Sequence, residues 1–230
     1  MQRKGAPPAT LDLFADQTAQ PRSDERIGPG SWLFRGFALS AMPQLLSALE
    51  ATLGLSPFRH MQTPSGLSMS AALSSCGQLG WITDRHGYRY SATDPQTGQA
   101  WPAMPDVFMQ LAQDAALAAG YAGFVPDACL INRYIPGARM SLHQDRNEHD
   151  HRWPVVSVSL GIPAIFQFGG QLRSDKTQRI SLFHGDVVVW GDEDRLRFHG
   201  ILPIKQAEHP QLGEQRINLT FRKAGRDSLF

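Results

Sequence analysis

The sequence is poor in cysteine, in net charge and in long apolar runs, and each shortage excludes a class of protein. It has two cysteines, Cys76 and Cys129, in 230 residues, too few for a disulfide framework and without the C-x-x-C spacing of zinc and redox sites. Lys plus Arg is 22 and Asp plus Glu is 21, a net charge of +1, so a polyanion could bind only through a local patch. No apolar run reaches membrane-spanning length, and residues 1–10 lack the apolar stretch of a signal peptide. We therefore expect a cytoplasmic protein without a membrane segment.

The length fits one domain built around one core. Residues 1–30 are rich in Pro, Gly and charge and contain a single short apolar segment, Leu11–Phe14. This composition predicts a flexible N-terminal arm with one apolar anchor. We expect residues 31–230 to form a single catalytic domain.

Two helices are predicted before the β-rich part of the chain. Ser40 stands in the N-cap position of a pattern with 3.6-residue spacing that ends at Gly54. A second pattern runs from about Pro105 to Ala119 and stops at Gly120. We expect both helices to brace a sheet.

The remaining segments predict a mainly β fold with flanking helices. Residues 56–104 mix Ser, Gly, Pro and Thr with scattered aromatics, which is typical of short strands and surface loops and suggests a lid. Residues of about 126–222 show short β runs broken by Gly, Pro and Asp, which indicates a sandwich or jelly roll core. The expected strands are 128–134, 155–160, 165–168, 180–183, 187–190, 196–199 and 217–222.

An H-x-D pair is the first sign of metal chemistry. In an extended segment His143 and Asp145 point to the same face, which places an imidazole beside a carboxylate. His199 lies in another expected strand. Two histidines and one carboxylate cover one face of a metal ion and leave three positions open, as in Fe(II) oxygenases. Zinc enzymes use the same donors, so the spacing alone leaves both metals open.

Other histidines have simpler interpretations. His184-Gly185-Asp186 repeats the H-x-D spacing but comes directly before the apolar run Val187–Trp190, so we interpret it as a tight turn into a strand. His149 and His151 fall in a run of charged residues, and we expect them to be solvated.

A strand near the C-terminus carries two arginines on one face. In Arg216–Arg222, the apolar residues alternate with Arg216, Asn218, Thr220 and Arg222. A strand buried on both faces cannot leave two guanidinium groups unpaired. Either the strand is half exposed, or the arginines meet acidic groups and could bracket a small dicarboxylate.

With H-x-D, a later His and R-x-N-x-T-x-R in this order, the chain resembles the AlkB family of Fe(II)/2-oxoglutarate dioxygenases. The resemblance extends from the segment Leu11–Asp16 to about Arg222. Motifs that are weak alone become specific when they are collinear over such a length. The supporting segments are residues 94–97, 101–105, 126–134, 156–161, 164–170 and 184–191.

The resemblance implies a double-stranded β-helix, the cupin-like jelly roll, with an N-terminal nucleotide-recognition lid. It implies that iron is bound by His143, Asp145 and His199, with 2-oxoglutarate and O2 as cosubstrates. The residues implied to hold 2-oxoglutarate are Asn132, Tyr134, Arg216, Asn218 and Arg222, with Trp190 packed near that pocket.

The activity that the resemblance implies is oxidative dealkylation of N-alkylated bases such as 1-methyladenine and 3-methylcytosine. The substrate would be single- or double-stranded DNA, or RNA, and 2-oxoglutarate would be decarboxylated to succinate as an aldehyde is released. An enzyme of this kind must extrude a base from a duplex or take single strands. The residues implied to contact the substrate are Trp81, Tyr88, Arg89, Tyr90, Asn147 and Arg173.

One position departs from the family pattern. Where the family has an Asp that faces the target base, this chain has Asn147. Several alkylated bases are cations, and an amide cannot attract them as a carboxylate does. The neighbouring Glu148 is the one residue that could substitute.

Two other functions fit parts of the sequence. A 2-oxoglutarate-dependent hydroxylase of a protein or small molecule would use the same iron site without lid aromatics. A metal-free or zinc-loaded module could bind damaged nucleic acid without reacting. Nothing in the sequence demands a dimer, so we expect a monomer.

Overall fold

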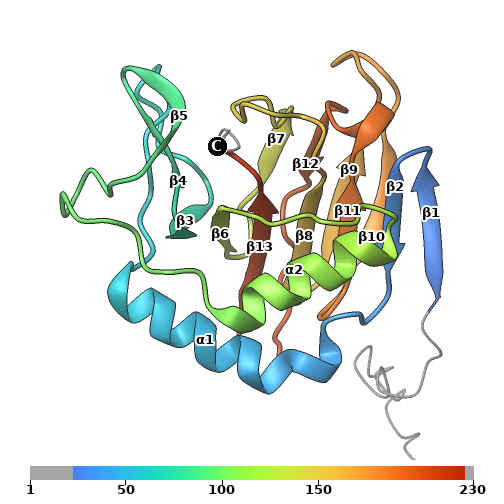
Figure 1. The fold of residues 1–230 in the computed structure, drawn as a ribbon, viewed down its shortest axis with the longest axis horizontal. Coiled ribbons are helices and arrows are strands. Elements are labelled where there is room, and N and C mark those ends of the chain that lie inside the picture. Colours follow the sequence, from blue (N-terminus) through green and yellow to red (C-terminus); the bar gives the residue numbers. More distant parts are fainter. Residues whose placement is uncertain (1–22, 226–230) are drawn as a thin grey trace, which may run out of the picture.

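The computed structural model describes residues 23–225, in which two antiparallel sheets face each other (Figure 1). The larger sheet has seven strands. In spatial order they are β1 (Asp24–Gly28), β2 (Ser31–Phe34), β11 (Val187–Trp190), β8 (Val155–Gly161), β13 (Arg216–Arg222), β6 (Ala128–Tyr134) and β3 (Ala72–Gly77).

The smaller sheet and a separate hairpin complete the β structure. The four strands of the smaller sheet are, in spatial order, β10 (Gln178–Leu182), β9 (Ala164–Phe168), β12 (His199–Ile201) and β7 (Met140–His143). The hairpin pairs β4 (Gly80–Asp84) with β5 (Gly87–Ser91) and lies beyond the β3 edge of the larger sheet (Figure 1). The predicted mainly β jelly roll is therefore confirmed.

Two hydrophobic cores hold the layers together. One lies between the sheets and includes Phe166, Phe168 and Trp190. The other lies between the larger sheet and the helices, with Leu45 and Phe108 among its members. Because the larger sheet is covered on both faces, every residue of β8 and β13 is buried, which requires an internal partner for each polar side chain.

Two α-helices, α1 (Met42–Leu55) and α2 (Asp106–Ala118), lie side by side against the larger sheet (Figure 1). The prediction that two helices brace a sheet is confirmed. Ser40, however, does not cap α1. It belongs to the 3-10 turn Leu39–Ala41, and Ala41 takes the N-cap position without a side-chain bond. None of the helices in residues 23–225 is long and apolar enough to span a membrane.

Three boundaries differ from the sequence predictions. Asp24–Gly28 was assigned to the flexible arm but pairs with β2, while residues 1–22 lie outside the described part of the chain. The expected lid of residues 56–104 includes β3, which belongs to the larger sheet. The strand predicted over 196–199 begins only at His199, because the 3-10 turn Asp192–Asp194 is continued by a backbone bond from Arg197 to Asp194.

Candidate metal centre and cosubstrate pocket

Three potential metal ligands meet between the two sheets. His143 ends β7 and His199 begins β12, and these two residues are directly opposed in the antiparallel pair. Asp145 follows β7. Its Oδ1 lies 3.8 Å from His143 Nε2, and its Oδ2 lies 3.8 Å from His199 Nε2. The ligand atoms of all three residues lie within 4.8 Å of one another. Each of the three sequence-predicted ligands is therefore part of one cluster.

Both imidazoles are oriented by backbone carbonyls. Nδ1 of His143 lies 2.9 Å from the Ser141 carbonyl oxygen, and Nδ1 of His199 lies 3.0 Å from that of Arg197. With the proton on Nδ1, Nε2 of each ring keeps a free lone pair that can coordinate a metal ion. The ligands differ in exposure, since the side chain of His143 is 39% exposed and that of His199 is 6% exposed. The His143 side is therefore the accessible side of the site.

Gly200 allows the two histidine strands to approach. A Cβ atom at this position would lie 2.6 Å from the Met140 carbonyl oxygen. Any larger residue would push β12 away from β7 and separate the two imidazoles, whose ring centroids are 4.4 Å apart.

The buried Asp145 is kept ionised by a neighbouring arginine. Arg222 donates to Asp145 Oδ2 from Nε at 2.9 Å and from Nη2 at 2.7 Å. Burial opposes ionisation of Asp145, but Arg222 and the two histidines hold the pKa of the carboxyl well below its usual range. Burial lowers the pKa of His199 to about 3. The cluster therefore presents a carboxylate at Asp145 and a neutral imidazole at His199, the forms that bind a divalent metal.

Arg216 is a buried cation without an acidic partner among the described residues. It is 1% exposed, and Nη2 donates to Ser159 Oγ at 3.0 Å. Its Nε and Nη1 atoms are buried and form no hydrogen bond. A buried unpaired guanidinium is costly, so this arginine fits a pocket that receives an anion. Of the two alternatives for this strand, full burial with acidic partners holds for Arg222 but not for Arg216.

Of the other predicted cosubstrate residues, Tyr134 contacts Arg216 directly, and two more carry unsatisfied buried polar atoms. Tyr134 packs its ring 5.2 Å from the Arg216 guanidinium carbon. Asn132 Oδ1 and Trp190 Nε1 are buried without hydrogen-bond partners, like the Arg216 nitrogens. Asn218 is different, because its side chain already bonds to Ser157, Val158 and Thr220. Unsatisfied buried polar atoms therefore occur on Arg216, Asn132 and Trp190, as expected of residues that bind a small polar ligand.

The lid hairpin is attached directly to the metal-ligand loop. Trp81 and Tyr88 stack with ring centroids 5.5 Å apart and an interplanar angle of 19°. Asn147 accepts a bond from Trp81 Nε1 at 3.4 Å and donates to the Tyr88 carbonyl oxygen at 3.4 Å. The aromatic pair, of which Tyr88 is exposed and Trp81 half-buried, is therefore bonded to a residue only two positions after the ligand Asp145.

A buried charge network links the same hairpin to the metal ligand. Tyr90 donates to Glu148 Oε1 at 2.7 Å, and Glu148 Oε2 lies 3.1 Å from Arg195. Arg222 connects this pair to Asp145, since its Nε is 3.5 Å from Glu148 Oε1. Arg195 was not predicted as a site residue. No local sequence pattern marks Arg195, because the groups that it contacts lie in the loop after β7, about 40 to 50 residues earlier in the chain.

The remaining predicted contacts are less central. Arg89 is tied to Asp84 by bonds of 2.9 and 2.7 Å. Arg173 is exposed, and its guanidinium carbon is 5.9 Å from the Phe198 ring centroid. Neither contacts the metal cluster in the described structure.

The other histidines mostly follow their simpler interpretations. His184-Gly185-Asp186 is a turn before β11, with Gly185 at φ +86° and Asp186 accepting from the Phe183 amide at 3.0 Å. His149 is exposed, as expected. His151 is only half exposed, because its Nε2 turns toward Glu148, 4.0 Å away.

Comparisons with known proteins agree with this geometry. The sequence model of the 2OG-Fe(II) oxygenase superfamily matches residues 31–222. Alpha-ketoglutarate-dependent dioxygenase AlkB of Salmonella typhimurium is 56% identical over 214 residues, covering 93% of this chain and 98% of the relative. The protein of the same name from Escherichia coli is 56% identical over 216 residues, covering 94% and 99%. The solved structure of OsALKBH1 has a TM-score of 0.74 and 29% identity and covers 87% of this chain and 100% of that one.

A jelly roll that joins two histidines and one aspartate between its sheets has the ligand arrangement of mononuclear iron oxygenases, and the superfamily match specifies iron and dependence on 2-oxoglutarate. Within that superfamily, the chain belongs to the AlkB family. It is therefore a dioxygenase whose cofactor is Fe(II) and whose cosubstrates are 2-oxoglutarate and O2, as the resemblance to the family implied.

Proposed function

We propose that this enzyme removes N-alkyl groups oxidatively from nucleic-acid bases, as in 1-methyladenine and 3-methylcytosine, and so repairs alkylation damage. The observation that carries the proposal is the half-exposed Trp81–Tyr88 stack, which is bonded through Asn147 to the loop of Asp145. An aromatic platform at this place can hold a flat base beside the metal. A hydroxylase of proteins or small metabolites has no need for it.

His143, Asp145 and His199 would hold the iron. The support is their cluster of donor atoms and the backbone bonds that direct both Nε2 atoms inward. When bound, iron with 2-oxoglutarate and O2 supplies the oxidising chemistry, which yields succinate, CO2 and an aldehyde from the alkyl group.

Arg216 and Arg222 would orient the cosubstrate between them. Arg222 pairs with Asp145 and so marks the metal end of the pocket. Arg216 lies six residues along the same strand, with two buried donor atoms left to bind the far carboxylate. Asn132, Tyr134 and Trp190 would line this pocket, and Asn218 would brace its wall through bonds to Ser157 and Val158.

The lid would receive a base that has left the helical stack. A base inside a duplex cannot reach a site between two sheets, so the enzyme would take single strands or extrude the base from double-stranded DNA or RNA. Trp81 and His143 would stack on the base, while Tyr88, Arg89, Tyr90 and Arg173 would contact or position the nucleotide. His143 is suited to this because its side chain is 39% exposed.

A panel of methylated oligonucleotides tests the function. The enzyme with Fe(II), 2-oxoglutarate and ascorbate should restore 3-methylcytosine in a single-stranded oligonucleotide, with one succinate formed per repaired base. If 2-oxoglutarate is consumed but no alkylated base is repaired, the substrate class is wrong. If neither reaction occurs, the iron assignment fails as well.

We further propose that the enzyme acts as a monomer in a reducing cytoplasm. The metal ligands, the cosubstrate pocket and the lid all come from one chain. Cys76 and Cys129 face each other across β3 and β6 and are both free thiols, which fits a reducing compartment. Residues 31–230 would form the single catalytic domain, with the β4–β5 hairpin as the working part of the lid.

A further inference from the structure

The loop of residues 144–154, which joins β7 to β8, carries Asp145 but contains no helix or strand. His143 and His199 are fixed by the antiparallel pairing of β7 with β12, whereas Asp145 lies outside that ladder. The ladder bonds that hold the two histidines therefore do not set the position of the carboxylate. Contacts with side chains have to do so.

Arg195 holds this loop at three points. Its Nη1 donates to the Asp145 carbonyl oxygen at 2.7 Å, and its Nε donates to the Trp153 carbonyl oxygen at 2.9 Å. Its Nη2 lies 3.1 Å from Glu148 Oε2. Because the donors of a guanidinium are fixed in one plane, a single side chain contacts the loop near its start, in its middle and near its end.

Arg195 also belongs to the segment that leads into the other buried ligand. It follows the 3-10 turn Asp192–Asp194 and lies four residues before His199. The Arg197 carbonyl oxygen of the same segment orients His199 through Nδ1. Arg195 therefore ties the loop of Asp145 to the segment that positions His199.

A second bond joins the same two segments. Gln144, the residue between His143 and Asp145, donates from Nε2 to the Leu196 carbonyl oxygen at 2.5 Å. Leu196 directly follows Arg195. The two bonds run in opposite directions between the segments, so neither segment can slide along the other without breaking one of them.

Burial keeps the Arg195 guanidinium in place. The side chains of Arg195 and Glu148 are each 2% exposed, and a buried ion is costly unless it is paired. Glu148 also accepts a bond from Tyr90 at 2.7 Å, which fixes the carboxylate. Moving Arg195 would leave this buried carboxylate without the cation that lies 3.1 Å from it.

We propose that Arg195 and Gln144 are positioning residues for the ligand Asp145. They fix its backbone relative to the two histidines, so that the three donor atoms stand within 4.8 Å of one another before a metal ion arrives. Such preorganisation lowers the cost of binding the ion. The inference rests on the proposed iron site, but not on which substrate the enzyme takes.

The iron affinity of two variants tests the proposal. Apoprotein is titrated anaerobically with Fe(II) at saturating 2-oxoglutarate, and the visible charge-transfer band gives the Kd. Arg195→Lys keeps the charge beside Glu148, but one ammonium cannot reach both carbonyl oxygens. We expect its Kd for Fe(II) to rise about 10- to 100-fold, as when outer-shell partners of metal ligands are lost. Gln144→Ala should raise the Kd about fivefold, the effect of one neutral hydrogen bond.

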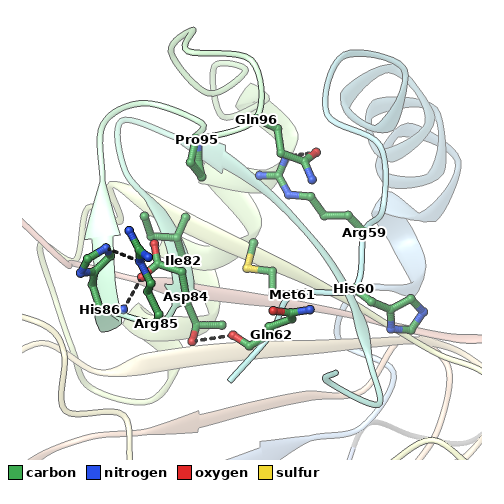
Figure 2. Close-up of a pocket in the computed structure, with 11 residues that line it drawn as sticks. Arg59, His60, Met61, Gln62, Ile82, Asp84, Arg85, His86, Pro95 and Gln96 are labelled. Carbon is green, nitrogen blue, oxygen red and sulfur yellow. Dashed lines mark hydrogen bonds between the residues drawn. The ribbon is translucent and has the colours of Figure 1, made fainter. Parts of the chain in front are cut away.

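The matched control is Arg59→Lys. Arg59 is also a largely buried arginine, with a side chain 13% exposed, and it donates to Asp94 and Gln96 beside the lid (Figure 2). These partners are not metal ligands, so the variant should keep the wild-type Kd even if its Tm falls. A Kd within twofold of wild type in folded Arg195→Lys overturns the proposal. If that variant does not fold, the same result in Gln144→Ala overturns it.

Mn(II) reports the geometry of the site without turnover. Low-temperature EPR of Mn(II)-loaded protein should show a changed zero-field splitting in Arg195→Lys and not in Arg59→Lys. A general loss of stability would lower the Tm but leave the Kd and the spectrum of the folded protein unchanged. If the wild type gives no charge-transfer band, the proposed iron site itself fails. If the wild type binds iron and Arg195→Lys matches it in Kd and spectrum, only the positioning role fails.

Discussion

Arg216 shows most clearly how the unsatisfied hydrogen-bond donors of one buried residue can indicate a binding site for an anion. A buried guanidinium with two unsatisfied nitrogens destabilises the protein unless an anion arrives. The strict alternation of apolar and polar residues predicted the strand and placed Arg216 and Arg222 on one face. It could not show which of the two arginines is paired with a buried carboxylate. That depends on Asp145, 77 residues away from Arg222.

Arg216→Met should separate ligand binding from stability. Loss of the charge should raise the KM for 2-oxoglutarate by about 100-fold or more, since a buried charge pair is worth roughly 3 kcal/mol. The Tm of the apoprotein should stay equal or rise, because an unpaired buried charge is removed. KM measurements and thermal unfolding check both halves. A large fall in apoprotein Tm with an unchanged KM would mean that Arg216 only supports the fold.

In the proposed complex with substrate, Asn147 would set the charge next to the lesion. The sequence left open whether Glu148 could supply the missing carboxylate. Glu148 is buried, bonds to Tyr90 and lies 3.1 Å from Arg195, so its charge is already balanced inside the protein. The base-facing side is therefore neutral at this position.

Asn147→Asp should favour cationic lesions. A carboxylate about 4 Å from a cationic base gains at least about 1 kcal/mol, or roughly fivefold. The ratio of kcat/KM for 3-methylcytosine to that for neutral 3-methylthymine should rise by this factor or more. Asn147→Ala, which loses the amide without adding charge, is the control and should not raise the ratio. An equal ratio in wild type and Asn147→Asp would place residue 147 outside the substrate contact.

At the scale of elements, the β4–β5 hairpin joins substrate recognition to the iron loop. Trp81→Ala should impair repair of methylated oligonucleotides more than uncoupled decarboxylation of 2-oxoglutarate, because in the proposed complex the stack holds the base and not the cosubstrate. The two rates are measured in parallel on the same preparation. Equal losses in both would show that Trp81 serves mainly as core.

A contact between two histidines from different segments should make the free energy of unfolding depend on pH in the acid range. His184, before β11, packs on His209 with ring centroids 4.2 Å apart, and burial lowers the pKa of His184 to about 4. Unfolded His184 takes up a proton near pH 6.5 while the folded protein does not, so this contribution to stability is present above pH 6.5 and is lost as pH falls toward 4.

His184→Asn tests this linkage. The amide oxygen can still accept the Gly161 amide bond that His184 Nδ1 receives at 3.0 Å, but it does not titrate. The free energy of unfolding of the apoprotein should therefore fall less between pH 6.5 and 4 in the variant, as measured by urea denaturation. Parallel pH curves for variant and wild type would contradict the assignment.

Sequence patterns predicted long buried elements well and short ones poorly. β6 and β11 occur where their apolar runs predicted, because burial on both faces leaves a strong signal. β7 and β12 have four and three residues, too few for alternation to be visible. Their pairing nevertheless brings His143 and His199 together, so the metal site depends on the elements that local pattern specifies least.

For the whole molecule, the H-x-D spacing located two ligands, whereas the third followed from register between distant strands. The resemblance to the AlkB family supplied that link before the fold was known. The sequence pattern therefore identified candidate ligands within one segment, but it could not show that segments far apart in the chain meet in space.

The central claim is that His143, Asp145 and His199 bind one ferrous ion beside the 2-oxoglutarate pocket. Anaerobic titration of the apoprotein with Fe(II) and 2-oxoglutarate tests it most directly, through the visible metal-to-cosubstrate charge-transfer band. We predict a band that saturates at one Fe(II) per chain and is lost in Asp145→Ala but kept in Asp150→Ala, a carboxylate paired with Arg152 outside the cluster. No band in the wild type, or an undiminished band in Asp145→Ala, would contradict the account.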